Sequence, residues 1–366
     1  MSVATRMISR RIKQDSRQTR GYKQGNPGPN AILLVMTWTS RTPALELRVL
    51  EISGADALAF LQGQLTNDVA SLAPIDKTGG AGSHHITGYC SPKGRLFFVG
   101  RLLRRTADSF WLLLPNERAE FAIKRLKMFV LRSKVTIQEL PLVCVGLLGA
   151  IEPESSAHRG GAEPLDSGLL VHLESNQEQG RGLFISEPAA PEKISDKGLA
   201  DLPMTSLETW ALSEIGAGVP SVSQSSSELF VPQTVNLDLV AGVSFTKGCY
   251  PGQEVVARTH YLGRLKRRMF RVELRTPQTE RVVGGSALQD IWSPNQPDEP
   301  CGRVIQLSTT SNEDPERAEM LIECELEAWK AGELRLGSLA GPELLALSLP
   351  YSVPLDVTAP PRPKLS

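Results

Sequence analysis

The stretch KGCYPGQE (Lys247–Glu254) decides how the fold of this sequence is interpreted. It places Cys249 between a Lys-Gly step and a Pro-Gly step, shortly before a helix predicted over 253–262. Glycine permits unusual backbone angles and close approach of another group, so both glycines here favour an accessible thiol. The helix start and the charge of Lys247 favour a thiolate. We therefore predict a reactive Cys249 with Lys247 as its charge partner, although a buried, inert cysteine is the commoner case.

The continuation of this stretch is strongly basic. Six cations and no acid lie between residues 258 and 271, namely Arg258, Arg264, Lys266, Arg267, Arg268 and Arg271. Such a run could grip a polyanion, for example a polyglutamyl tail or RNA phosphates. It could equally be a solvated helix end, where cations suit the helix dipole. The charge pattern leaves both interpretations open.

The other four cysteines are predicted to be packing residues or are given no chemical role: Cys90, Cys144, Cys301 and Cys324. The total of five is odd and contains no Cys-x-x-Cys, which argues against a disulfide framework and against a zinc or iron–sulfur site built from local spacing. Free thiols indicate a reducing compartment. The pair His84–His85 has no His or Cys at ligand spacing, so no protein-bound metal is predicted.

The chain of 366 residues is long enough for two or three domains. Its formal charge is zero, but residues 1–41 hold eight Lys and Arg against one acid, and the remainder holds 32 basic and 39 acidic residues. Such a body does not resemble a general nucleic-acid binder. The basic segment has the composition of a transit peptide, but we favour an unstructured extension or a true start at Met36. Its apolar runs are too short to cross a bilayer.

Periodicity predicts a mixture of strands and helices. Strands are expected at 45–52, at 110–115, at 140–150, and on both sides of a turn at Ser91–Gly94. A helix is expected to start with a capping box of Ser53 and Asp56, and another with Thr205 and Glu208. A third should be capped by Asn116, with an apolar stripe of Ala122, Leu126, Phe129 and Val130. Residues 152–168 suggest a loop, and short alternating segments after Arg271 suggest a small antiparallel barrel or sandwich.

The octapeptide KGCYPGQE resembles the signature K-G-C-Y-x-G-Q-E of the YgfZ-type folate-binding proteins, relatives of the glycine-cleavage T-protein (aminomethyltransferase). The likeness continues through ISGADALAFLQGQLTNDV, YCSPKGRL, WALSEIGAGVP and FVPQTVNLDLVAGVSF. It implies an α+β, T-protein-like folate-binding fold with a C-terminal antiparallel β-barrel. The expected division is a basic extension at 1–41, a core of two intertwined α+β subdomains at 42–270, the barrel at 271–358 and a tail at 359–366.

The resemblance also implies a function. It implies binding of tetrahydrofolate or a derivative, and a role in assembly or repair of iron–sulfur enzymes, including those that thiomethylate tRNA. A family tryptophan of the folate site matches Trp210, and a second one is replaced here by Leu47, which removes a stacking ring. The remaining residues expected around the cofactor are Gln233, Asn236, Tyr250, Gln253, Glu254 and Arg258.

One departure from the T-protein bears on catalysis. That family carries an Asp pair after its N-terminal hairpin turn and a Glu in an L-E-A-G motif. The matching positions here are the stretch LFFVG (96–100) and Gly216. Apolar rings cannot act as acid, base or cation stabiliser, so a T-protein-like one-carbon transfer is the alternative rather than the first hypothesis. A tRNA-binding module is the second alternative, and a cytoplasmic or, with a transit peptide, mitochondrial location is expected.

Overall fold

A computed structural model describes residues 37–75, 83–150, 161–176, 179–188, 198–263, 265–276, 288–309 and 316–356. The chain divides into residues 1–35 and one compact unit of residues 36–366, and all the elements below belong to the second unit. None of the helices in the described ranges is long and apolar enough to span a bilayer.

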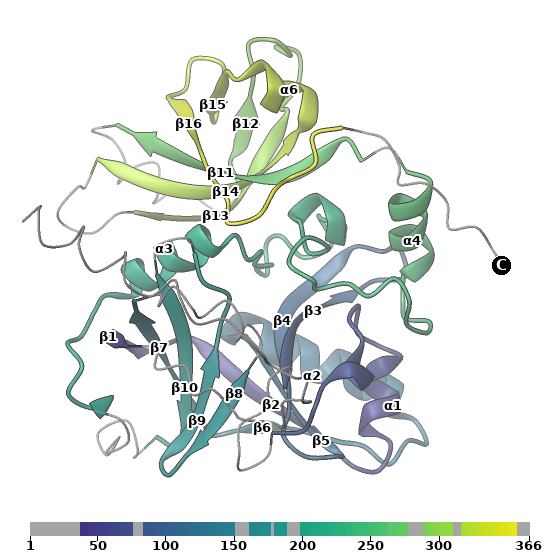
Figure 1. Cartoon of the computed structure of the whole chain (residues 1–366). Helices are drawn as coiled ribbons and strands as arrows, with labels where there is room; N and C mark the ends of the chain where they lie inside the picture. The colour runs from purple at the N-terminus through teal and green to yellow at the C-terminus, as the bar shows by residue number, and fades with distance from the viewer. Residues whose placement is uncertain are drawn as a thin grey trace, which may run out of the picture. The chain divides into compact units, whose positions relative to one another are not determined.

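Two antiparallel five-stranded sheets form the N-terminal part of this unit (Figure 1). The first has the order β1 (Trp38–Ala44), β7 (Val143–Gly149), β10 (Gly180–Ser186), β9 (Gly168–His172) and β8 (Ala162–Leu165). The second has the order β3 (His84–Cys90), β4 (Leu96–Arg104), β5 (Ser109–Pro115), β2 (Leu47–Ser53) and β6 (Thr136–Leu140). Because only residues 45 and 46 separate β1 from β2, the chain passes directly from one sheet to the other. The two sheets are therefore interleaved in sequence.

Helices α1 (Ala57–Gln62) and α2 (Asn116–Val130) bury their apolar faces against β2, β4 and β5. Two details of the prediction are wrong. Ser53 ends β2, and the residue before α1 is Asp56, whose carboxylate accepts a hydrogen bond from the Lys134 amide at 2.7 Å. Ala122 and Leu126 of the predicted stripe are buried, but Phe129 is 38% exposed, and Arg118 and Ala119 turn inward as well.

A separate apolar cluster lies between the two sheets. It includes Val49 and Leu113 from the second sheet, and Leu148 and Leu183 from the first. Trp210 of α3 (Leu207–Ala217) belongs to the same cluster, with Leu47 packed at its edge. The capping box predicted for α3 is one residue out of place, since Ser206 accepts from the Thr209 amide at 3.1 Å. The helix ends at Gly218, which has φ +65°.

The predicted loop at 152–168 is partly wrong. Residues 151–160 lie outside the described ranges, but Ala162–Leu165 form β8, which pairs with β9 from Ala162 opposite Val171 to Leu165 opposite Gly168. This edge strand was not predicted, because it is short and lies in a mainly polar segment without clear apolar alternation. The strand forms through its pairing with β9.

The C-terminal part is a closed antiparallel barrel, as expected. Its strands follow in the order β11 (Arg267–Arg275), β14 (Arg317–Glu325), β13 (Gly302–Thr309), β12 (Asp290–Trp292), β15 (Leu334–Leu336) and β16 (Glu343–Leu347), and β16 pairs back onto β11. Cys301 and Cys324 lie inside it. The short helix α6 (Leu326–Ala331) was not predicted, and its Trp329 stacks on Phe270 at 3.9 Å.

The expected boundaries are displaced by a few residues. The predicted division at 270/271 falls inside β11, and the predicted extension to residue 41 overlaps β1.

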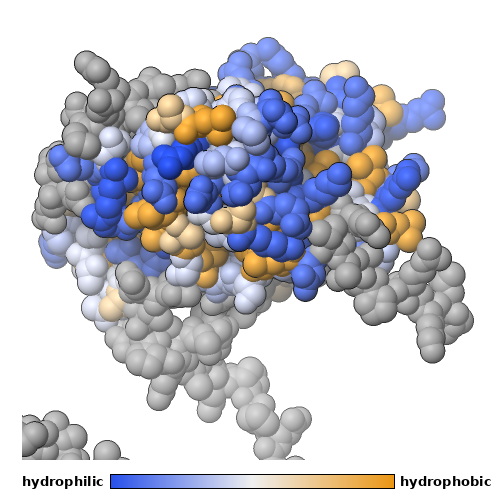
Figure 2. Space-filling model, turned by 90° about the horizontal axis from the view of Figure 1, so that it is seen from above, coloured by the Kyte–Doolittle hydropathy of each residue, from blue (hydrophilic) through white to orange (hydrophobic). Residues whose placement is uncertain are grey.

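The remaining helical elements are short. In sequence, the turn η3 (Val69–Ser71) follows α1, and the turn η5 (Pro232–Val235) and α4 (Gln253–Tyr261) lie between α3 and the first strand of the barrel. Polar and apolar residues are interspersed on the face shown in Figure 2, as on an ordinary solvated surface.

Candidate functional site

The predicted reactive cysteine lies in the loop before α4. Cys249 is exposed, whereas the neighbouring Tyr250 ring is only 6% exposed. Gly252 has φ +78° and ends the loop, so that α4 begins at Gln253 as predicted. A left-handed residue here is easily adopted only by glycine. The loop therefore presents one side chain, the thiol, outward while its other large group is packed inside.

A second turn fixes this loop from the side. Gly94, in the turn between β3 and β4, has φ +69° and lies against Gly252. A Cβ atom on Gly252 would stand 2.3 Å from the Ser91 carbonyl oxygen, and one on Gly94 would stand 2.7 Å from the Val255 Cβ. Because the backbones touch, both positions require glycine. The motifs SPKG and KGCYPGQE, more than 150 residues apart, thus form one unit.

Gly248 differs from the sequence expectation. It is not among the glycines with positive φ, and a Cβ there would meet nothing within 4 Å. Of the two glycines beside the cysteine, Gly252 alone is required by the backbone.

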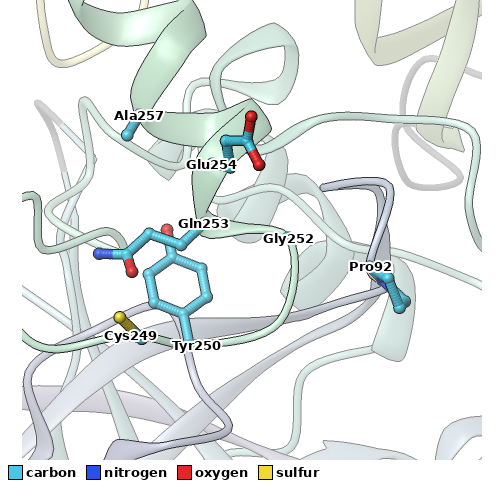
Figure 3. Close-up of a pocket in the computed structure, with 7 residues that line it drawn as sticks. All are labelled: Pro92, Cys249, Tyr250, Gly252, Gln253, Glu254 and Ala257. Carbon is cyan, nitrogen blue, oxygen red and sulfur yellow. The ribbon is translucent and has the colours of Figure 1, made fainter.

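An open pocket of about 480 Å³ adjoins the thiol. Its walls come from the docked turns and the first turns of α4: Pro92, Cys249, Tyr250, Gly252, Gln253, Glu254 and Ala257. Figure 3 shows the Cys249 sulfur and the Gln253 amide on the same side of the Tyr250 ring. The volume is within the range of about 300–1,000 Å³ for small-molecule sites. The structure thus brings Cys249, Tyr250, Gln253 and Glu254 together.

Lys247 is buried and turns into the protein. Its ammonium donates to the carbonyls of Gln62, Leu65 and Asn67 at 2.6, 2.6 and 3.0 Å. Burial lowers its pKa to about 8, and the three carbonyls favour the charged form, so it is an ammonium at neutral pH. Because all three of its protons are used, Lys247 ties the Cys249 loop to the segment after α1. Its electrostatic effect on Cys249 stays a prediction.

The described environments of the five cysteines give a labelling prediction. Cys249 is exposed and the other four are buried. Burial raises the pKa of Cys144 to about 12 and raises that of Cys90 further. Iodoacetamide at pH 7 should therefore modify Cys249 before any of the four buried cysteines, as followed by mass spectrometry of peptides. Modification of a buried cysteine before Cys249 would contradict this order, and denaturant should make all five reactive.

Trp210 lies in the core between the sheets, with 5% of its surface exposed. The Arg181 guanidinium is 4.9 Å from the ring centroid, and a Cβ on Gly146 would meet the ring at 2.5 Å. Arg181 is held by Ser213 Oγ at 3.0 Å and by the Glu214 carboxylate at 3.2 Å. Trp210 and Leu47 thus share one core cluster, apart from the residues that line the Cys249 pocket.

A buried ionic group that the sequence did not reveal lies in the same interior. Arg101 pairs through both terminal nitrogens with Glu174 and contacts His84 Nδ1 at 3.0 Å. Burial, with the Arg101 charge, lowers the pKa of His84 to about 3. Burial opposes ionisation of Glu174, but Arg101 outweighs it and lowers that pKa to about 2. From the sequence, His84 was given no role beyond the absence of a metal site, and the one available signal was the presence of Arg101 in a largely apolar strand.

Two predicted cofactor residues serve as internal braces. The Gln233 amide donates to the Val256 carbonyl at 2.7 Å, which ties η5 to α4. The Asn236 amide donates to the Met269 carbonyl at 2.8 Å, which ties the same segment to β11. Both are at most 2% exposed, and neither lines the Cys249 pocket. Arg258 is exposed on α4.

The basic run at 258–271 is largely neutralised. Arg267 pairs with Glu325 at 2.7 Å, Arg268 with Asp238 at 2.7 Å, and Arg271 with Glu319 at 2.6 Å. Arg264 lies outside the described residues, while Arg258 and Lys266 are exposed. This run was interpreted as a possible free binding surface for a polyanion. That interpretation is wrong for Arg267, Arg268 and Arg271, because β11 turns these three arginines of the run toward acids of neighbouring segments.

Comparison with known proteins identifies the family. No family model matches the chain. A tRNA-modifying protein YgfZ of Colwellia psychrerythraea is 38% identical over 236 residues, which cover 62% of this chain and 68% of that protein. The chain belongs to the YgfZ family. A YgfZ protein of Edwardsiella ictaluri is 34% identical over 232 residues, covering 60% of this chain and 67% of its own length.

A solved structure agrees with this YgfZ membership at the level of fold. The glycine cleavage system aminomethyltransferase T from Bartonella henselae matches with a TM-score of 0.60 and 14% identity, covering 86% of each chain. The expected T-protein-like fold is confirmed. At this identity the likeness establishes fold and not activity.

Proposed function

We propose that this YgfZ-family chain is a folate-binding accessory protein that supports assembly or repair of iron–sulfur enzymes, including ones that thiomethylate tRNA. The observation that carries the proposal is the placement of Cys249. It is an exposed thiol at the mouth of a pocket, held there by two interlocked turns and by Lys247. A single such thiolate can form a mixed disulfide, accept a sulfur or lend one ligand to a transient cluster. The partners are then the client enzymes.

Tetrahydrofolate is the proposed cofactor, and the interior between the two sheets is its proposed site. Trp210 offers a ring there, Leu47 lies in the same cluster, and the His84–Arg101–Glu174 group supplies polar atoms. His85 Nε2 is buried without a hydrogen-bond partner among the described residues, but His85 is paired with Leu102 of the core under α1 and α2 and so lies on the opposite face of β3 from His84. Its nitrogen therefore does not bear on the site between the sheets. The part of the cofactor nearest Cys249 would be contacted by the pocket residues Tyr250, Gln253 and Glu254 and by the exposed Arg258.

An aminomethyltransferase activity is disfavoured by the residues at the catalytic positions of that family. Phe98 is fully buried and Phe97 is 8% exposed, both in the core beneath α1 and α2. Gly216 supplies no carboxylate, and a Cβ there would face Asn176 at 3.2 Å and Arg271 at 3.7 Å. Formaldehyde or ammonia release from an aminomethyl-lipoyl substrate would restore the transferase alternative. The free thiols favour the cytoplasm, or the mitochondrial matrix if residues 1–41 are a transit peptide.

Calorimetric titration with tetrahydrofolate tests the cofactor. Trp210→Ala should weaken tetrahydrofolate binding by about 0.5–1.5 kcal/mol from lost stacking. The loss should be larger if the bound cofactor also buries apolar surface of the Trp210 ring. Trp210→Phe, which keeps a ring, should bind between the parent and the Ala variant. The matched control is Trp329→Ala in the barrel, which removes a stacked ring without touching the interior between the sheets. An unchanged dissociation constant in a folded Trp210→Ala variant would remove Trp210 from the site.

A further inference from the structure

The C-terminal end of α2 exposes three large apolar side chains close together in sequence. Met128 is 62% exposed, Phe129 38% and Leu131 87%. Single exposed apolar residues are ordinary, but contiguous ones mark interaction surfaces. We call Met128, Phe129, Leu131 and the cations around them the α2-end patch.

The backbone of the exposed Leu131 has strained torsion angles. It has φ 44° and ψ −104°, within a turn closed by the Ser133 amide and the Val130 carbonyl at 2.7 Å. These angles are near those of the first central residue of a type II′ turn, where glycine is normal. A leucine in this region is strained, and strained residues cluster at functional positions. Neither burial nor backbone preference accounts for the presence of a leucine at position 131.

The surface beside the turn is hollowed. An open pocket of about 690 Å³ is lined by Asp56, Phe129, Leu131, Arg132 and Ser133. The Asp56 carboxylate accepts from the Lys134 amide, so the turn is fixed to the segment before α1. The hollow is therefore part of the fold and has an apolar wall. It shares no lining residue with the Cys249 pocket.

Cations surround the apolar centre. Residues 124–134 contain five cations and no acid, and Lys124, Lys127, Arg132 and Lys134 are exposed. The Arg125 guanidinium lies 5.4 Å from the Phe129 ring centroid. Lys124 pairs with Glu120 one turn earlier on α2. An apolar centre with a charged rim is the anatomy of a protein interface, and the sign of the rim selects an acidic partner.

We propose that the α2-end patch docks an acidic amphipathic segment of a partner protein. Its apolar side chains would enter the hollow beside Leu131, and its carboxylates would meet Lys127 and Arg132. A nucleic acid fits less well, because Met128 and Leu131 offer no stacking ring and Arg125 lies over Phe129. A membrane surface fits less well because three residues at one helix end are not an extended apolar face. The proposal does not depend on folate or on Cys249.

Panning of a phage-displayed random peptide library on the full-length chain, with counter-selection on Leu131→Gly, provides the test. Enriched peptides should combine Asp or Glu with apolar residues at helical spacing. Fluorescence anisotropy with one synthetic peptide should show at least roughly tenfold weaker binding to Leu131→Gly and to Met128→Ser. Lys127→Glu with Arg132→Glu should weaken it similarly, and salt should weaken binding to the parent. Leu339→Ser, an exposed leucine 38% accessible in the barrel part, is the matched control and should bind normally.

Leu131→Gly also separates docking from folding. Glycine adopts φ 44° without strain, so this variant should melt no lower than the parent while it loses the peptide. A lower melting temperature would make Leu131 a packing residue and overturn the proposal. The proposal would also be overturned if the enriched peptides lacked acidic residues, or if they bound Leu131→Gly and Met128→Ser as tightly as the parent. Binding of total tRNA or of phosphatidylglycerol vesicles with the same dependence on Leu131 and Met128 would replace the protein partner by a nucleic acid or a membrane.

Discussion

Replacing Cys249 with Ser should reduce client activity to the level of cells that lack the protein. We expect a fall of about tenfold or more in the share of tRNA that carries a thiomethyl group, measured by mass spectrometry of digested tRNA. The hydroxyl keeps the size of the side chain, but it is a far weaker nucleophile and metal ligand than a thiolate. The effect is large because the other four cysteines are buried and none can replace this thiol at the pocket.

The same variant should fold normally. Cys249 is exposed, and exposed substitutions usually change the free energy of unfolding by less than about 0.5 kcal/mol. Its melting temperature and its tetrahydrofolate affinity should therefore match those of the parent. Cys90→Ser, which removes a buried thiol, is the control and should keep client activity wherever it remains folded.

Two results would separate the parts of this hypothesis. Full restoration of client activity by Cys249→Ser would return the residue to a structural role. If the parent chain itself did not raise client activity in those cells, the iron–sulfur function would fail, whatever the role of the thiol.

Much of the fold follows from local pattern. The turn at Ser91–Gly94, the helix at Gln253 and the antiparallel barrel were predicted because strand alternation, turn residues and glycine angles act over a few residues. The first residues of two helices were predicted incorrectly. Ser206, not Thr205, caps α3, since adjacent hydroxyl residues are equivalent in sequence and only packing selects one.

The site shows where sequence stops being sufficient. Cys249, Tyr250, Gln253 and Glu254 come together because they are neighbours in one loop and helix. Gln233 and Asn236 precede these residues in the same family-like stretch, but their side chains point inward and hydrogen-bond to α4 and β11. That orientation depends on how α4 and β11 pack, which the sequence does not show. The pairing of Arg101 with Glu174 joins β4 of one sheet to the segment that follows β9 of the other, 73 residues later in the chain. No periodicity encodes such a contact, and a single chain offers no second sequence in which the pair could vary together.

The interlocking of the two turns carries the largest stability prediction. Gly252→Ala should lower the free energy of unfolding by about 2–5 kcal/mol, measured by urea denaturation. Its φ of +78° is strained for any residue with a Cβ. The new atom would also stand 2.3 Å from the Ser91 carbonyl oxygen and 2.6 Å from the Gly94 nitrogen. Both are backbone atoms, so no side-chain rotation can relieve the overlap, and the turns would have to separate.

Gly248→Ala is the matched control, four residues earlier in the same loop. Its Cβ would meet nothing within 4 Å and its φ is not positive, so the change should stay within about 0.5 kcal/mol of the parent, or stabilise slightly by restricting the unfolded chain. Equal effects of the two substitutions would show that the turns do not dock. A loss at Gly252 well above the roughly 1–2 kcal/mol of left-handed strain alone would support docking of the turn at Ser91–Gly94 against the Cys249 loop. Pro92 and Gly252 line the same pocket as the thiol.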